Sequence, residues 1–94
     1  MRIVFDARAR DDIERLFDWI ANDNPKAALD MVSRIEARVR LLAAPGFAQM
    51  GRPGVVEGTR EVVEHPYIVV YEVREREREI VVIAVMHGAQ NRDP

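Results

Sequence analysis

The 94-residue sequence contains no cysteine. Disulfide bonds, cysteine metal ligands and a cysteine nucleophile are therefore excluded, and the composition fits the reducing cytoplasm, where we expect the protein to act. No hydrophobic run is long enough to span a membrane, and the opening segment Met1–Phe5 is followed at once by charged residues. We therefore expect neither a signal peptide nor a transmembrane anchor.

An excess of positive charge is also missing, because 14 basic residues face 16 acidic ones and the formal net charge is −2. Proteins that bind nucleic acid usually carry a basic excess, since neutralised phosphates supply most of their non-specific affinity. A contact with RNA or DNA would therefore depend on a local cluster of arginines. Every basic residue except Lys26 is an arginine, the better bidentate ligand of phosphate.

The signatures of several common chemistries are absent as well. The histidines and carboxylates show no metal-ligand spacing, and the Gly-rich segment 51–54 does not lead into a helix, as a phosphate-binding loop would. Ser33 lies within a predicted helix and not in a nucleophile motif. We therefore expect no metal ion and no other cofactor.

The residues that are present predict one globular domain over 1–94, since 48% are hydrophobic and 32% are charged. Asp6 can cap a first amphipathic helix from Ala7 to about Asn22. Asn24 can cap a second helix, which begins at Pro25 and ends near Leu42 or Ala44. So short a connection predicts an antiparallel helical hairpin, whose apolar stripes must be buried against another layer.

That layer is predicted to be a sheet. Arg2–Phe5 is typical of a short first strand, and three runs rich in Val, Ile and Tyr follow the helices, at 58–64, 67–73 and 80–87. We therefore predict a two-layer α+β domain, in which the N-terminal strand and the antiparallel helical hairpin pack on a small antiparallel sheet. The sheet face away from the helices would be partly apolar and open to a partner.

Three residues at predicted strand entries and exits, and one near the C-terminus, are candidates for chemistry. Arg60 either pairs with a neighbouring carboxylate or points at a phosphate or an acidic partner, and Arg52 lies in a loop restrained by glycine and proline. His87 ends an apolar strand and is either a structural histidine or a group that transfers protons near neutral pH. Arg92 could reach the same end of the sheet.

Several pieces of the sequence, in this order and at this spacing, resemble the RelE/ParE superfamily of bacterial type II toxins. They are the break at Asn24-Pro25, Gly51-Arg52, Gly58-Thr59-Arg60-Glu61, Tyr67-Ile68-Val69-Val70-Tyr71 and Ile83-x-Val85-x-His87. The likeness covers essentially the whole chain. It implies a growth-inhibiting toxin whose cognate antitoxin is encoded by the adjacent gene, wraps around it with an extended or helical segment, and forms a toxin–antitoxin hetero-oligomer with it.

The resemblance leaves the target open. ParE-like members, also described as plasmid stabilisation proteins, inhibit DNA gyrase, and the acidic balance of this chain favours that target. RelE-like members are ribosome-dependent endoribonucleases that cleave mRNA, and in this sequence Arg60 and His87 match residues of their motif, with Arg52 as a further phosphate ligand. The tail after His87 lacks an aromatic residue, which counts against the ribonuclease. A non-toxic relative that only binds its partner is the third alternative.

Overall fold

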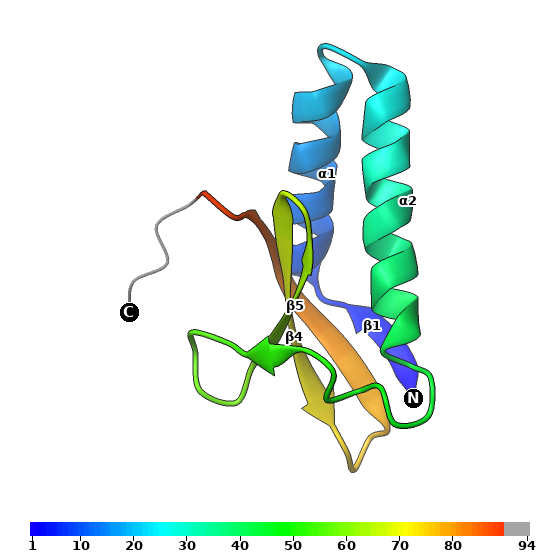
Figure 1. Cartoon of the computed structure of the whole chain (residues 1–94), viewed down its shortest axis with the longest axis vertical. Helices are drawn as coiled ribbons and strands as arrows, with labels where there is room; N and C mark the ends of the chain where they lie inside the picture. Colours follow the sequence, from blue (N-terminus) through cyan, green and yellow to red (C-terminus); the bar gives the residue numbers. More distant parts are fainter. Residues whose placement is uncertain (90–94) are drawn as a thin grey trace.

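In the computed structural model, which describes residues 1–89, two helices pack on a five-stranded sheet (Figure 1). Arg92 lies outside the described residues. The α+β fold and its helical hairpin are confirmed, and no helix of the described part is long and apolar enough to cross a membrane. The elements in chain order are β1 (Arg2–Phe5), α1 (Ala7–Ala21), α2 (Pro25–Leu41), β2 (Arg52–Pro53), β3 (Arg60–Glu64), β4 (Tyr67–Arg74) and β5 (Glu79–His87).

Both helices begin at the caps that the sequence predicts. The Asp6 side chain accepts a hydrogen bond from the amide of Ala9 at 3.0 Å, and the Asn24 side chain accepts one from the amide of Ala27 at 3.1 Å. The two helices lie side by side, as a hairpin that extends past the sheet at one end (Figure 1).

The sheet has the order β1-β5-β4-β3-β2. Three of its strand pairs are antiparallel, as expected, but β1 runs parallel to β5 and the sheet is therefore mixed. The helical hairpin connects β1, at one edge of the sheet, to β2, at the opposite edge. The last strand, β5, then pairs with β1. The two-residue strand β2 occupies part of the segment that the sequence predicts to be a loop.

The main core lies between the helices and one face of the sheet. Its fully buried side chains include Ile35 and Val39 of α2, and Val69, Tyr71 and Val82 of the sheet. On the opposite face, a smaller cluster is built from Ile68, Val70 and Ala84. That face is less open than its sequence suggests, because these three side chains are at most 9% exposed.

Candidate partner-binding site

Strand β1 forms one edge of the sheet. The amides of Arg2 and Asp6 donate to the carbonyls of Arg78 and Val82 at 2.9 and 3.0 Å, so alternate residues of β1 are bonded to β5. The backbone groups of Ile3 and Phe5 therefore face the outer edge, since successive residues of a strand point their peptide groups in opposite directions. An edge of this kind can pair with a strand from another chain.

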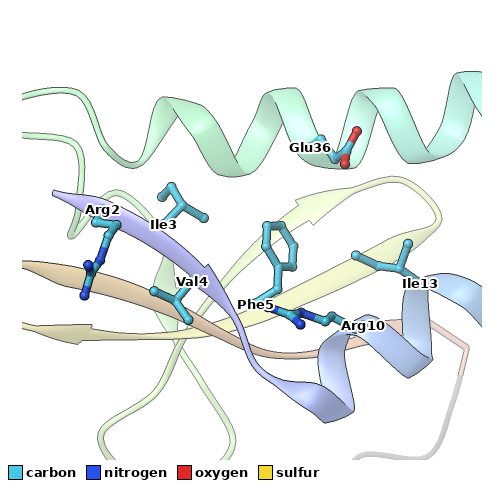
Figure 2. Close-up of a pocket in the computed structure, with 7 residues that line it drawn as sticks. All are labelled: Arg2, Ile3, Val4, Phe5, Arg10, Ile13 and Glu36. Atoms are coloured by element: carbon cyan, nitrogen blue, oxygen red, sulfur yellow. The ribbon is translucent and has the colours of Figure 1, made fainter.

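A hollow of about 550 Å³ opens beside this edge (Figure 2). Ile3 and Phe5 of β1 point into it, toward α2, and Ile13 of α1 lies at its end. All three side chains are only partly buried, although they pack against the main core. The hollow therefore offers apolar surface next to unpaired backbone groups, the combination that β-strand addition uses for specificity and affinity.

Charged residues surround this apolar surface. Glu36 of α2 lies across the hollow from β1, and Arg10 of α1 lies beside Phe5 (Figure 2). Arg2 points away and pairs with Glu79 of β5. An extended segment placed here would meet cationic and anionic side chains on its two sides, which would fix its register.

The sequence predicts a site elsewhere, around Arg60, Arg52 and His87. The guanidinium of Arg60 is directed at the loop before β2: its Nη2 atom donates to the backbone carbonyl of Gln49 at 3.0 Å and to that of Gly51. Arg60 therefore holds the loop between α2 and β2, an arrangement that neither alternative for this arginine includes.

Arg52 is also engaged within the chain. Its Nε atom donates to Oε1 of Glu61 at 3.2 Å, and Glu61 is only 3% exposed. Arg52 of β2 is directly opposite Glu61 of β3, and Arg60 is the residue before Glu61 in β3. Because successive strand residues face opposite sides, the side chains of Arg52 and Arg60 leave opposite faces of the sheet.

His87 lies at the other end of the sheet. It is paired with Tyr67 of β4, whereas Arg60 is paired with Tyr71. Tyr67 and Tyr71 are four steps apart along β4, about 13 Å at ~3.3 Å per residue. The structure therefore brings Arg52 and Arg60 close together on β2 and β3, on opposite faces of the sheet, and leaves His87 apart from them at the end of β5.

The surroundings of His87 form a second hollow, between β5 and α1, lined by Asp12, Arg15, Leu16, Trp19, Tyr67, Val85, Met86 and His87. The rings of His87 and Tyr67 pack edge to face, with centroids 5.5 Å apart. The Nδ1 atom of His87 accepts from the amide of Ala89 at 3.0 Å, so the neutral ring carries its proton on Nε2. Burial raises the pKa of the Tyr67 phenol, which stays protonated at neutral pH. Trp19, which lies off the apolar stripe of α1, is 78% exposed.

The sequence gives little indication of the hollow beside β1. The run Arg2-Ile3-Val4-Phe5 predicts only a short strand. Which strand forms an edge of the sheet depends on pairing across the whole chain, and no local pattern contains it.

Comparisons with known proteins agree with the fold. Residues 3–92 match the family model described as ParE toxin of type II toxin-antitoxin system, parDE. The putative toxin Y4kP of Sinorhizobium fredii (strain NBRC 101917 / NGR234) is 35% identical over 91 residues, which cover 95% of this chain and 90% of that protein.

Two solved structures share the fold over nearly their whole length. A chain of the chromosomal ParDE TA system from P. aeruginosa superimposes with a TM-score of 0.79 at 24% identity, and covers 93% of this chain and 95% of that one. A chain of the intact E. coli RelBE toxin-antitoxin complex superimposes with a TM-score of 0.67 at 14% identity, and covers 96% of this chain and 98% of that one.

Proposed function

The chain belongs to the ParE toxin family of type II toxin-antitoxin systems, and on this premise we propose that it arrests bacterial growth by binding DNA gyrase in the cytoplasm. The observation that carries the choice of target is the separation of Arg52, Arg60 and His87 described above. Inhibition through a protein–protein contact requires a complementary surface but no convergent catalytic groups. The formal net charge of −2 also favours a protein target over RNA.

The ribosome-dependent mRNA endoribonuclease remains the second candidate, because of the pair formed by His87 and Tyr67. These rings pack together at 5.5 Å, and an imidazole can transfer a proton to or from a ribose hydroxyl. Cleavage would also need a cation on the scissile phosphate. Arg52 and Arg60 would have to leave their present contacts with Glu61 and with the loop carbonyls to supply it.

A cognate antitoxin is the second partner in this proposal. We place part of its binding surface at β1, where an extended antitoxin segment would pair with the backbone of Ile3 and Phe5 and insert apolar side chains against Ile13. Pairing at an edge strand supplies affinity through main-chain hydrogen bonds, while the hollow selects the side chains. The resulting complex is a hetero-oligomer of toxin and antitoxin.

Purified gyrase tests the target. We expect the wild-type protein to block DNA supercoiling or to trap cleaved DNA, and the His87→Ala variant to do so equally well. Full supercoiling at a large excess of the protein would contradict the proposal. Loss of growth arrest in the His87→Ala variant, together with active mRNA cleavage by the wild type, would favour the ribonuclease. No growth arrest by the wild type would indicate a relative that only binds its partner.

Amide hydrogen exchange tests the antitoxin surface. The amides of Arg2 and Asp6 are bonded to β5 in the free protein and serve as internal controls. Addition of the antitoxin should slow exchange at Ile3 and Phe5 and leave the two control amides nearly unchanged. Unchanged exchange at Ile3 and Phe5 in a saturated complex would exclude strand addition at β1.

A further inference from the structure

The loop of residues 47–51, between α2 and β2, is tied to the sheet by Tyr71 as well as by Arg60. The hydroxyl of Tyr71 donates to the carbonyl of Ala48 at 2.9 Å and accepts from the amide of Gly51 at 3.0 Å. Tyr71 is fully buried. With the two bonds from Arg60, four side-chain hydrogen bonds therefore fix the backbone of this short segment.

Gly51 shows how closely the loop approaches the sheet. A Cβ atom at this position would lie 2.5 Å from the carbonyl oxygen of Glu61 and 2.7 Å from the hydroxyl of Tyr71. Only glycine allows this approach without a shift of the backbone. The loop is therefore rigidly held against the sheet.

The same loop presents two large apolar side chains to solvent. Phe47 and Met50 are each 43% exposed, and the amide of Met50 donates to the carbonyl of Phe47 at 3.0 Å, which closes a turn between them. A rigid loop loses little conformational entropy on binding, and aromatic and Met side chains are enriched at the centres of protein interfaces. The arrangement is typical of a preorganised protein contact.

The side chain of Arg60 also carries one unsatisfied donor. Among the described residues, its Nε atom is buried and has no hydrogen-bond partner, a feature that Arg38 shares. An unsatisfied buried donor lowers stability and partly offsets the two hydrogen bonds that Arg60 makes to the loop.

We propose that the 47–51 loop is the surface through which this toxin contacts the protein that it inhibits, with Phe47 and Met50 entering an apolar recess of that protein. Arg60 and Tyr71 are then positioning residues. The proposal rests on the proposed function in taking the target to be a protein. The chemistry of the surface supports a protein over a nucleic acid, because Nη2 of Arg60 is engaged with loop carbonyls and the large exposed side chains, Phe47 and Met50, are apolar.

The 47–51 loop can be tested independently of the hollow beside β1, which we assign to the antitoxin. It leads into β2, the edge strand opposite β1 in the sheet. Substitutions in the loop should therefore alter contact with the target and leave strand addition at β1 intact.

The test compares the Phe47→Ser/Met50→Ser double variant with Leu29→Ser, which removes an equally apolar, 60% exposed side chain from α2. We expect the double variant to bind its target on the order of tenfold more weakly, a loss of about 1.4 kcal/mol, and to raise colony survival on induction as a result. Leu29→Ser should arrest growth like the wild type. Thermal midpoints and co-purification with the antitoxin should be unchanged in both, and the two single variants replace the double variant if it is unstable.

The Arg60→Ala variant separates a positioning role from direct contact. It should speed amide exchange across residues 47–51, raise survival as the double variant does, and keep antitoxin binding. Loss of growth arrest in Arg60→Ala with undiminished arrest in Phe47→Ser/Met50→Ser would overturn the proposal, as would loss of antitoxin co-purification in the double variant. Growth arrest that depends on the loop while purified gyrase is unaffected would refute the gyrase target and leave the loop proposal standing. No arrest by the wild type would overturn both.

Discussion

Arg60 of β3 and Tyr71 of β4 are direct partners across an antiparallel strand pair, and both side chains end on the loop of residues 47–51. A guanidinium and a phenol on neighbouring strands thus act together on one segment of backbone. Arg60, which the sequence suggests for contact with a phosphate, therefore donates to carbonyl oxygens of this loop instead.

The Tyr71→Phe variant should be less stable than the wild type. It removes two hydrogen bonds and leaves the amide of Gly51 and the carbonyl of Ala48 without the hydroxyl, a loss of about 1–3 kcal/mol. Urea denaturation measures the change. Tyr67→Phe is the matched control, because no hydrogen bond joins the Tyr67 hydroxyl to the described residues, and equal losses in the two variants would contradict the anchoring role.

The carboxylate of Asp12 should stabilise the C-terminal part of β5. Its Oδ2 atom accepts from the amide of Val85 at 2.9 Å, beyond the point where β1 ends. Asp12→Ala leaves that amide without its acceptor and should cost about 1–2 kcal/mol, whereas Asp12→Asn keeps an acceptor oxygen and should cost less. Thermal denaturation checks the order of the two variants, and a larger loss in Asp12→Asn would refute it.

Gly51→Ala should destabilise the protein, because the new methyl group would meet the Glu61 carbonyl oxygen and the Tyr71 hydroxyl within 3 Å. Overpacking of this kind costs about 1–3 kcal/mol. Because the two sites touch, the cost should be smaller in the Tyr71→Phe background, where one of the two obstacles is gone. Strictly additive losses in a double-mutant cycle would show that the alanine is accommodated elsewhere.

The stability of the protein should fall at alkaline pH, partly through Tyr67. Burial raises the pKa of this phenol in the folded state, so the unfolded chain loses its proton first as the pH rises above about 10. The folded state then binds more protons than the unfolded one, and the free energy of unfolding decreases until the pH passes the folded pKa. Urea midpoints of the wild type and of Tyr67→Phe can be measured between pH 8 and 11, a range of about three units around the ordinary phenol pKa. The midpoint should decline less steeply with pH in the variant. Identical slopes would contradict this origin.

Much of the fold could be predicted from local patterns. The caps Asp6 and Asn24, the apolar stripes and the runs of Val and Ile place the helices and most of the strands, because each signal lies within a few residues of the element that it starts or fills. The parallel pairing of β1 with β5 could not be predicted in this way, since it joins residues 77 positions apart and depends on how the helical hairpin crosses the sheet.

The site is harder to predict for a related reason. The sequence favours Arg60 and His87 because of their chemistry and their places at strand ends, but which strand end meets which depends on register. The register pairs His87 with Tyr67, the first residue of β4, and Arg60 with Tyr71, in the middle of that strand. The contacts of Arg60 with carbonyl oxygens leave no trace in composition or periodicity, because any loop supplies carbonyl groups.

Incorporation of labelled thymidine and of a labelled amino acid, followed side by side after induction in growing bacteria, tests the central claim most directly. If the toxin acts by binding gyrase, thymidine incorporation should fall first, and the His87→Ala variant should behave like the wild type. A fall in amino-acid incorporation that precedes any effect on DNA synthesis, and that disappears in His87→Ala, would contradict the account and favour mRNA cleavage.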